Sequence, residues 1–462
     1  MSISTSLTQH QQEAFNAIIS NIKYNFSSFF QNHYIEDRLI SLSGPAGTGK
    51  SYLTTQIVKA LTLELSKSEY FHNEGICITA PTHKATNVLR NMLKIQGIDS
   101  ECRTIQSFLN VRLIYNYDTG EEKFVAIRKT NNPPKASLLI VDESSMISSQ
   151  LFEYITEAIR VGNVNTVLFI GDPYQLQPVN SKNNKIFELN RQYALTDIVR
   201  QAKDSNIIKL ATKLRTCIET QKFCDLKEII KNSGNSSDIE LFTSNDLFTS
   251  DFYKNENWYQ EDKIVLSYTN KVVDGINKYI RTKFWEEQDV SKPLFLQKSD
   301  MIRFKSTCTS IELFGADPRI LYQNSEEVMI DSAKSHYSEK LDINIWTCTV
   351  ADRNKEDFFR VIDPNSEIML EKLLQHYAKS AMKSRDLYRK IYWKKYFRLR
   401  DSFADVQYIF ASTIHKSQGS TYNTAYVDLA SLINSKTLSN DTKYRLAYVA
   451  ITRASKKVKL LY

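Results

Sequence analysis

The fold of this chain is decided by the stretch Gly44-Pro45-Ala46-Gly47-Thr48-Gly49-Lys50-Ser51. An apolar run typical of a short buried strand, Leu39–Leu42, precedes it, and Tyr52–Leu63 follows with apolar residues at helical spacing. Between a strand and a helix, glycines let backbone N–H groups surround phosphate oxygens at the positive end of the helix. Lys50 would reach the β- and γ-phosphates, and the Ser51 hydroxyl would ligate Mg²⁺. The stretch therefore predicts a nucleoside triphosphate site, because an incidental glycine turn does not explain all its fixed positions.

Composition narrows the class of protein. The chain has 462 residues, of which 42% are hydrophobic and 24% charged, and its net charge is +8. These values suit more than one soluble domain, and the mild basic excess is compatible with nucleic acid. No secretory segment opens the sequence, and no apolar run approaches the ~20 residues of a membrane span. The cysteines are scattered without a CxxC pair, which argues against a zinc site or a disulfide framework and suits a reducing compartment.

The first predicted helix begins after Thr8, which has the hydroxyl expected of a helix N-cap. Ala14, Phe15 and Ile18 would face inward from this helix. A glutamine here could read an adenine edge, since an amide offers both a donor and an acceptor. A polar residue on an exposed helix face explains the glutamines equally well.

Hydroxyls also follow the next predicted strands. Ile76–Ala80 is typical of a buried strand and ends at Pro81-Thr82-His83, before another helix. A short element, Arg103–Phe108, contains Thr104. These hydroxyls and His83 could hold a nucleic-acid phosphate backbone. Helix capping is the simpler explanation for each threonine taken alone.

A β-hairpin is predicted between the core strands. Leu113–Tyr117 and Lys123–Ile127 alternate apolar and polar residues on either side of Asp118-Thr119-Gly120. The three central residues have the chemistry of a tight turn. We interpret this hairpin as an appendage to the nucleotide fold.

Two carboxylates end the next strand. Leu138–Val141 predicts a strand buried on both faces, and Asp142 and Glu143 follow at its carboxyl end, where such sheets bind ligands. Asp142 would hold Mg²⁺ through water, and Glu143 would orient and deprotonate the attacking water. A further strand, beginning at Val167, leads to a loop in which Gln175 is placed to sense the γ-phosphate.

The C-terminal half predicts a second core domain with an insert. Lys263–Asn270 is typical of another strand, followed by a helix. From about Phe284 to Ala404 the pattern becomes β-rich, with short strands predicted at Met301–Phe304, Glu327–Ile330, Ile343–Val350 and Phe358–Ile362. Lys379–Arg400 then predicts one basic helical stretch with interleaved aromatics. Nucleic-acid binding and an amphipathic helix with an aromatic packing face both explain that stretch.

Taken together, these stretches resemble the ordered motifs of superfamily 1 helicases, and within them the RecD-like group. The match runs from Leu7 to Ala454 in the order of the family, which is more specific than any single motif. The motifs are Leu7-Thr8-x-x-Gln11, Gly44–Ser51, Ala80-Pro81-Thr82-His83, Asp142-Glu143-Ser144-Ser145-Met146, Gly171-Asp172-x-x-Gln175, Thr269-Asn270-Lys271 and Thr413-Ile414-His415-Lys416-Ser417-Gln418-Gly419.

The resemblance assigns roles to individual residues. It implies that Gln11 reads the adenine, that Gly419 lies in the nucleotide site, and that Arg200 and Arg453 are arginine fingers. Without it, Arg200 reads as a surface arginine. It also implies DNA contacts at Pro81, Thr82, His83, Thr104, Thr269, Asn270, Thr413 and His415.

The resemblance also implies that the hairpin is the pin that separates the strands of the duplex. Of the two aromatics beside its turn, Phe124 matches the pin position better than Tyr117. Packing of Phe124 against the base of the hairpin is an equal alternative.

The predicted fold class is α/β, with two RecA-like parallel-sheet domains, an inserted β-hairpin and an inserted SH3-like β domain with a helical extension. We expect the first RecA-like domain at residues 1–190, with the hairpin at 109–134. The second would occupy 191–285 and 405–462, and the insert 286–404.

The predicted function is an ATP-dependent DNA helicase that uses ATP and Mg²⁺ and moves 5′ to 3′, the direction being implied by the family alone. Expected partners are single-stranded DNA, fork duplex, and single-stranded-DNA-binding or replication proteins, in DNA replication, repair or recombination. We expect a cytoplasmic monomer without membrane contact, in the host cytoplasm if a bacteriophage encodes it. Two alternatives stay open: an ATP-switched clamp that does not unwind, and a helicase directed at RNA.

Overall fold

The computed structural model describes residues 7–27, 34–65, 75–127, 133–178, 185–198, 205–310, 319–351 and 357–462. The chain divides into two compact units. The first comprises Met1–Val111, Ala126–Asn270 and Ser412–Tyr462, and the second comprises Arg112–Val125 and Lys271–Ala411. In the described part of the chain, no helix is both long and apolar enough to cross a membrane.

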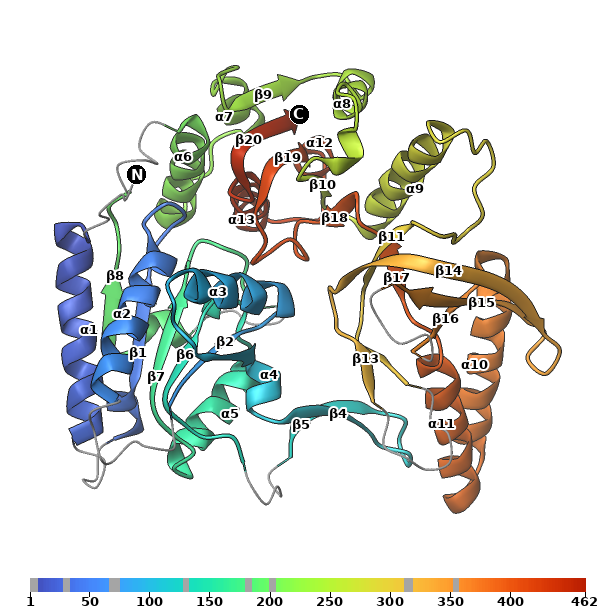
Figure 1. The fold of residues 1–462 in the computed structure, drawn as a ribbon, viewed down its shortest axis with the longest axis horizontal. Coiled ribbons are helices and arrows are strands. Elements are labelled where there is room, and N and C mark those ends of the chain that lie inside the picture. Colours follow the sequence, from blue (N-terminus) through green and yellow to red (C-terminus); the bar gives the residue numbers. More distant parts are fainter. Residues whose placement is uncertain are drawn as a thin grey trace. The chain divides into compact units, whose positions relative to one another are not determined.

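The first unit contains a six-stranded parallel sheet with the strand order β3-β2-β6-β7-β1-β8 (Figure 1). Its strands are β1 (Leu39–Ser43), β2 (Ile76–Ala80), β3 (Glu101–Thr104), β6 (Ala136–Val141), β7 (Val164–Gly171) and β8 (Arg191–Ala194). Every residue of β2, β6 and β7 is buried. Such continuous burial is expected of parallel strands covered on both faces, and it confirms the strands predicted from apolar runs.

Helices cover both faces of this sheet. On one face, α1 (Gln9–Ser27), α2 (Lys50–Leu65) and α3 (His83–Ile95) pack against strand residues such as Ile40. On the other face, α4 (Ile105–Phe108) and α5 (Ser149–Arg160) pack with residues such as Leu39. Neighbouring residues of a strand point to opposite faces, so the four inner strands β1, β2, β6 and β7 contribute to both cores. The loops at the carboxyl ends of the strands then carry the polar side chains.

A second sheet in the same unit has the strand order β18-β10-β19-β20-β9 (Figure 1). Its strands are β9 (Ile239–Phe242), β10 (Lys263–Ser267), β18 (Ala411–Thr413), β19 (Tyr422–Asp428) and β20 (Ala454–Leu461), and β10, β19, β20 and β9 run parallel. The helices of this half are α6 (Asn206–Thr220), α7 (Leu226–Lys231), α8 (Asn245–Phe252), α12 (Ala430–Ile433) and α13 (Asn440–Ile451). Residues of α6, α7, α12 and α13 share one buried core with the sheet. The prediction of two parallel sheets in an α/β fold is confirmed.

The second unit contains the predicted β-rich insert. A five-stranded antiparallel sheet has the order β16-β15-β14-β11-β17, and β12 and β13 form a separate pair. The strands are β11 (Met301–Phe304), β12 (Cys308–Thr309), β13 (Ile320–Tyr322), β14 (Glu327–Ser338), β15 (Ile343–Val350), β16 (Phe359–Ile362) and β17 (Val406–Tyr408). The strand predicted at Glu327–Ile330 is longer than expected, because its largely polar continuation pairs with β15 as far as Ser338.

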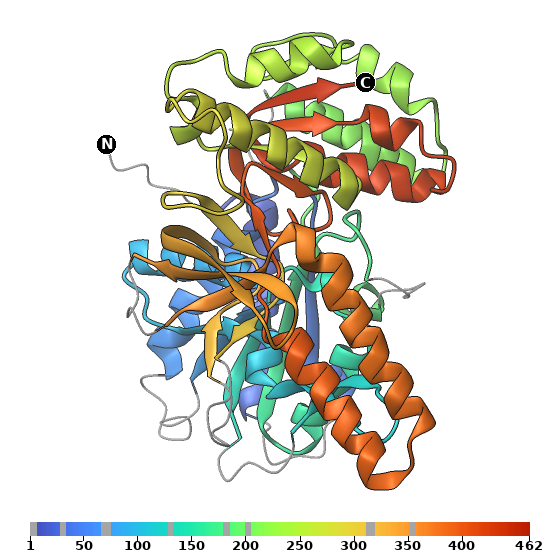
Figure 2. The same ribbon diagram turned by 90° about the vertical axis from the view of Figure 1, so that its right-hand side faces the viewer.

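The described part of the second unit also contains the helices α9 (Asn270–Glu286), α10 (Glu367–Lys383) and α11 (Asp386–Asp401). The prediction of one continuous helix over Lys379–Arg400 is wrong. The Ser384 N–H ends α10 by donating to the Ser380 carbonyl at 3.1 Å, and Asp386 has a positive φ of 46° that reverses the chain. Figure 2 shows α10 and α11 side by side as an antiparallel pair.

The predicted hairpin is present, with strands β4 (Val111–Tyr115) and β5 (Glu122–Ala126). At its turn, the Gly120 N–H donates to the Asn116 carbonyl at 2.7 Å, and Gly120 has a φ of 77°. A Cβ at Gly120 would overlap the indole of Trp393 on α11. Glycine is therefore required there both for the turn and for close packing on the helix.

One face of α11 packs its aromatic residues, whereas Tyr388 near the start of the helix is 67% exposed. Trp393 and Phe397 are 6% and 2% exposed and form a cluster with Tyr115 and Tyr117 of the hairpin. The aromatic packing face expected of this stretch is therefore present on α11, although the stretch as a whole is not one helix. Phe124, in contrast, is 57% exposed.

Candidate functional site

The predicted phosphate loop connects β1 to α2. Gly47 and Gly49 have φ angles of 83° and 77°, which glycine adopts without strain. Lys50 Nζ donates to the carbonyl oxygens of Gly44 at 2.5 Å and Pro45 at 3.1 Å, so the ammonium group lies over the loop. Phosphate oxygens accept stronger, charge-assisted bonds than carbonyls do. The same ammonium group is therefore placed to hold a phosphate of the nucleotide.

Gly44 is required by close packing at the start of the loop. Its N–H donates to the Gly171 carbonyl at 3.1 Å, which joins the loop to the end of β7. A Cβ at Gly44 would lie 2.7 Å from Thr48 Oγ1 and 2.9 Å from the Leu195 carbonyl oxygen. Real Cβ atoms do not approach so closely, and one of these neighbours is backbone, so only glycine fits.

Gln11 belongs to a capping box at the start of α1. The Thr8 N–H donates to Gln11 Oε1 at 3.0 Å, and the Gln11 N–H donates to Thr8 Oγ1 at 3.3 Å, so Thr8 caps the helix as predicted. Gln11 Nε2 donates to the Thr48 carbonyl at 3.0 Å. Gln11 is 5% exposed, so it is buried against the phosphate loop and is not on an exposed helix face. The amide keeps a second N–H and a second lone pair, with which it could also meet an adenine.

The two carboxylates follow β6. Glu143 has φ 49° and ψ 39°, a left-handed conformation that is strained for a residue with a side chain and clusters at functional sites. Burial, and then the charge of Glu143, raise the pKa of Asp142 to about 7, although the charge of Lys50 opposes the shift. A cation beside Asp142 would favour its ionised form.

Ser51 and Asp142 offer the oxygen donors that Mg²⁺ prefers. In phosphoryl-transfer sites, one or two protein oxygens hold Mg²⁺ together with phosphates and water. Among the residues that the structure describes, no three His, Cys, Asp or Glu side chains gather into a site that could hold a metal alone. The donor set therefore fits a Mg²⁺ that binds together with the nucleotide.

Gln175 lies in the loop that follows β7. Gln175 is 6% exposed, and its Oε1 atom has no hydrogen-bond partner in the described part of the chain. Arg445 of α13 donates to the Pro173 and Gln175 carbonyls at 2.7 and 3.0 Å. Tyr448 of the same helix donates to Asp172 at 2.6 Å. Sequence patterns do not predict these two α13 residues, because their partners lie far away in the sequence.

Gly419 is brought to the strand ends of the first sheet. It has a φ of 71°, and a Cβ there would lie 3.1 Å from Ala85 Cβ, 3.7 Å from Thr82 Oγ1 and 3.8 Å from Glu143 Cγ. The segment that contains Gly419 therefore lies beside the predicted general base, although more than half of the chain separates them.

Of the two predicted arginine fingers, Arg453 and Arg200, the structure describes only Arg453. Arg453 follows α13 and is 6% exposed. Its guanidinium donates to the Val449 and Ser420 carbonyls, both at 3.1 Å. Arg200 lies outside the described residues.

Four predicted DNA contacts of the first sheet lie at one edge. Pro81, Thr82 and His83 follow β2, and Thr104 ends the neighbouring parallel strand β3. Thr82 Oγ1 accepts from the Ala85 N–H at 3.3 Å, and Thr104 Oγ1 accepts from the Ser107 N–H at 3.2 Å. The capping role of both threonines is confirmed. A capping hydroxyl still has its own hydrogen to donate to a phosphate.

Four more predicted DNA contacts lie at the equivalent edge of the second sheet. Thr269 and Asn270 follow β10, and both are exposed. Thr413 ends the adjacent strand β18, and its Oγ1 accepts from the Lys416 N–H at 3.3 Å. The ring of His415 lies 6.3 Å from that of Tyr268.

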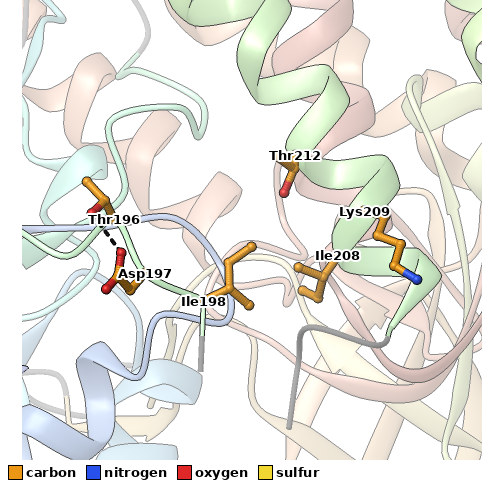
Figure 3. A pocket seen from close by; sticks show the side chains of 6 residues that line it. All are labelled: Thr196, Asp197, Ile198, Ile208, Lys209 and Thr212. Carbon is orange, nitrogen blue, oxygen red and sulfur yellow. Dashed lines mark hydrogen bonds between the residues drawn. The ribbon is translucent and has the colours of Figure 1, made fainter. Parts of the chain in front are cut away.

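A pocket of about 400 Å³ lies between the segment after β8 and the first turns of α6. Figure 3 shows its lining of Thr196, Asp197, Ile198, Ile208, Lys209 and Thr212. His10, next to Gln11, has its Nδ1 atom 3.8 Å from Asp197, and the Leu195 N–H donates to the Ser43 carbonyl at 2.8 Å. The pocket thus combines two apolar side chains with hydroxyl and charged groups.

Two parts of the chain match known families. Residues 31–228 match the AAA domain, and residues 408–461 match the UvrD-like helicase C-terminal domain. The chain belongs to the RecD-like group of superfamily 1 helicases. The family predicted from the motifs is therefore confirmed, and this helicase carries its two matched parts in the first unit, apart from residues 112–125 and 408–411.

Similar proteins come from viruses, bacteria, an archaeon and fungi. This helicase is 27% identical to the ATP-dependent DNA helicase Dda of Enterobacteria phage T4, over 97% of each chain. It is 24% identical to an uncharacterized protein, R530, of Acanthamoeba polyphaga mimivirus, over 91% of this chain and 94% of that protein. A crystal structure of Pif1 helicase from Bacteroides, in complex with ADP-AlF3 and single-stranded DNA, covers 99% of this chain and 92% of its own, with 16% identity and a TM-score of 0.49.

Proposed function

We infer that the chain is an ATP-dependent DNA helicase, which hydrolyses ATP at the loop Gly44–Ser51 and unwinds duplex DNA 5′ to 3′. One observation carries the inference. Gly419 belongs to the part that matches a helicase C-terminal domain, and a Cβ placed on it would lie 3.8 Å from Cγ of Glu143, which follows β6. The residues proposed for hydrolysis and a motif of the second sheet therefore lie together in one unit. A motor whose conformation changes with its bound nucleotide requires such an arrangement.

Each residue of the site has a proposed part in hydrolysis. Lys50 neutralises charge on the β- and γ-phosphates, and Glu143 accepts a proton from the attacking water. Ser51 and Asp142 hold Mg²⁺, which when bound supplies charge stabilisation to the phosphates. Gln175 accepts a bond from the water through its buried Oε1 atom, or donates one to the γ-phosphate through its amide N–H. Arg453, together with Arg200, neutralises charge that develops on the γ-phosphate.

The base of ATP is proposed to enter the pocket between the segment after β8 and α6. Ile198 and Ile208 offer apolar surface to a purine ring, and Thr212 and Asp197 offer hydrogen-bonding groups to the base or the ribose. The link to Gln11 is its neighbour His10, whose Nδ1 atom lies 3.8 Å from Asp197 of the pocket, while Gln11 itself bonds to the phosphate loop at Thr48.

The two parallel sheets are proposed to be RecA-like domains that grip one DNA strand in turn. The contacts would come from the strand-end residues of each sheet, namely Pro81, Thr82, His83, Thr104, Thr269, Asn270, Thr413 and His415. The hairpin β4–β5 would be the pin, and the antiparallel sheet with α10 and α11 would be the SH3-like insert with its helical extension. The predicted boundaries, at residues 190, 285 and 404, remain proposals.

The partners and the pathway are proposed from the relatives. Single-stranded DNA and forked duplex are the proposed substrates, and Mg²⁺ is the proposed metal. Single-stranded-DNA-binding or replication proteins are the proposed protein partners, in DNA replication, repair or recombination, with a cytoplasmic monomer as the working form. The phage relative makes a bacteriophage source part of this proposal.

ATP hydrolysis and duplex separation, measured together on the same preparation, test the assignment. We expect hydrolysis to rise when single-stranded DNA is added, and duplex separation to require ATP. Glu143→Gln is the matched control, because an amide of the same size cannot accept the proton; it should bind ATP but hydrolyse it about 10²–10⁴-fold more slowly. DNA-stimulated hydrolysis without any strand separation would favour the ATP-switched clamp.

A further inference from the structure

Helix α13 holds the loop after β7 through one of its faces. Asp441, Arg445 and Tyr448 are spaced along the helix so that they share this face. Arg445 Nε is paired with Asp441 at 2.9 Å, while its Nη1 atom donates to the Pro173 and Gln175 carbonyls. Arg445 thereby fixes the backbone of the segment that carries Gln175.

Tyr448 reaches from the same face into the nucleotide site. Its hydroxyl donates to Asp172 Oδ2 at 2.6 Å and accepts from the Ala46 N–H at 3.0 Å. Tyr448 is 1% exposed and Asp172 is fully buried. A bond of this length between a hydroxyl and a carboxylate is charge-assisted. Burial and the charge of Asp172 raise the pKa of Tyr448, so the hydroxyl stays protonated and able to donate.

The two bonds of Tyr448 join segments that are distant in the sequence. Ala46 belongs to the phosphate loop, and Asp172 begins the loop that carries Gln175. On the helix itself, the carbonyl of the next residue, Val449, accepts from the guanidinium of Arg453. Buried polar groups are costly to leave unpaired. A displacement of the phosphate loop therefore has to move Tyr448 with it or break a buried bond.

We propose that the Tyr448 hydroxyl is a positioning group for ATP hydrolysis, which keeps the phosphate loop at Ala46 and the Asp172–Gln175 loop in register with α13 and Arg453. Tyr448 touches neither nucleotide nor water in this role; it acts through the groups that do. This inference rests on the proposed function, since it presupposes an ATP-hydrolysing site. Small displacements of positioned groups cost rate rather than affinity, by up to about 100-fold for 1 Å.

Tyr448→Phe tests the role, because it keeps the ring and removes only the hydroxyl. Tyr444→Phe is the matched control: Tyr444 lies on the same helix, is 2% exposed and donates to the Cys224 carbonyl at 2.6 Å, away from the nucleotide site. We expect Tyr448→Phe to lower the DNA-stimulated kcat about 10- to 100-fold and to leave the KM for ATP within about 3-fold. Each of the two variants loses one buried hydroxyl, so we expect Tyr444→Phe and Tyr448→Phe to lower Tm by similar amounts. Tyr444→Phe should nevertheless leave kcat within about 2-fold of the wild-type value.

A double-mutant cycle with Asp172→Asn makes the test specific. If the hydroxyl and the carboxylate act as one unit, the double variant should be no slower than the slower single variant. The inference is overturned if Tyr448→Phe keeps its kcat, if Tyr444→Phe loses kcat equally, or if the two single effects multiply in the double variant. Wild-type protein without ATPase activity would instead overturn the proposed function, so the two failures are distinguishable.

Discussion

Tyr115 of the hairpin stacks on Phe397 of α11, with ring centroids 4.2 Å apart and ring planes inclined by 12°. The Tyr115 hydroxyl donates to Asp401 at 2.6 Å, and Arg400 pairs with Glu122 on the other hairpin strand. The hairpin is thus held along its length by one face of a helix. A pin that has to resist the duplex needs such a rigid support.

A weaker contact between the hairpin and α11 should reduce duplex unwinding without reducing ATP hydrolysis. Tyr115→Ala removes the stacked ring, and aromatic pairs contribute about 0.5–1.5 kcal/mol beyond the area they bury. We expect most duplex separation to be lost while ATPase activity stimulated by single-stranded DNA is kept. Tyr115→Phe keeps the stack and loses only the bonds of the hydroxyl to Asp401 and Arg400, so it should unwind at nearly the wild-type rate. Equal activity of the alanine variant and the wild type would show that the hairpin needs no anchor.

The pin aromatic itself is expected to be Phe124. It is 57% exposed, whereas Tyr117 packs near Phe397 with ring centroids 6.1 Å apart. Base–aromatic stacking is worth about 1–3 kcal/mol, comparable with the mean ~1.4 kcal/mol of a base-pair step. Phe124→Ala should therefore abolish most strand separation and preserve translocation on single strands. Loss of both activities would indicate misfolding, and loss of neither would place the pin elsewhere.

Both arginine fingers should control the rate of hydrolysis. Such an arginine is worth on the order of 10³–10⁵ in kcat in related NTPases, and Arg200→Ala should show a loss of this order with DNA bound. Arg453 is buried and holds two carbonyls, so alanine there would also lower stability. Arg453→Lys is the sharper variant, because it keeps the charge but loses the planar fork. Normal hydrolysis by both variants would refute a site completed from the second sheet.

Asp238 should make the stability of the first unit depend on pH. Burial alone would raise the pKa of Asp238, but hydrogen bonds from Asn206, Ser236, Ile207 and Ser205 outweigh burial and hold it at about 2. Since an unfolded aspartate has a pKa of about 3.9, the stabilisation is present above about pH 4 and is lost as the pH falls toward 2.

Melting temperatures of wild type and Asp238→Asn, recorded from pH 7 down to the acid limit of folding, test this. Because the carboxylate is partly exposed, we expect a loss of only about 1 kcal/mol at pH 7. The difference between the two proteins should shrink below about pH 4. Asp274→Asn, at an exposed position of α9, is the control. A difference that stays constant with pH would contradict the assigned pKa.

Local patterns were sufficient to predict most core strands. Ile76–Ala80 and Lys263–Ser267 are continuous apolar or nearly apolar runs whose burial is expected from their own sequence. The break between α10 and α11 was not predictable in this way, because good helix formers flank Ser384 on both sides. The polar end of β14 escaped prediction because backbone pairing, not an apolar face, stabilises it.

The site was predictable where a motif concentrates its chemistry in consecutive residues. Lys50, Asp142 and Glu143 were proposed as site residues in this way, but the strained backbone of Glu143 was not foreseen. Tyr448 was not predicted, because its partners Ala46 and Asp172 lie 402 and 276 residues away in the sequence. A tyrosine in an apolar helix by itself predicts only packing. Long-range pairing of this kind requires the structure.

Separation of two DNA duplexes that differ only in the polarity of their single-stranded tail is the most direct test of the helicase assignment. With ATP and Mg²⁺, we expect the wild type to separate the 5′-tailed duplex and to leave the 3′-tailed duplex intact. Glu143→Gln should separate neither. ATP hydrolysis without separation of either duplex, or separation of the 3′-tailed duplex alone, would contradict an ATP-driven helicase that moves 5′ to 3′.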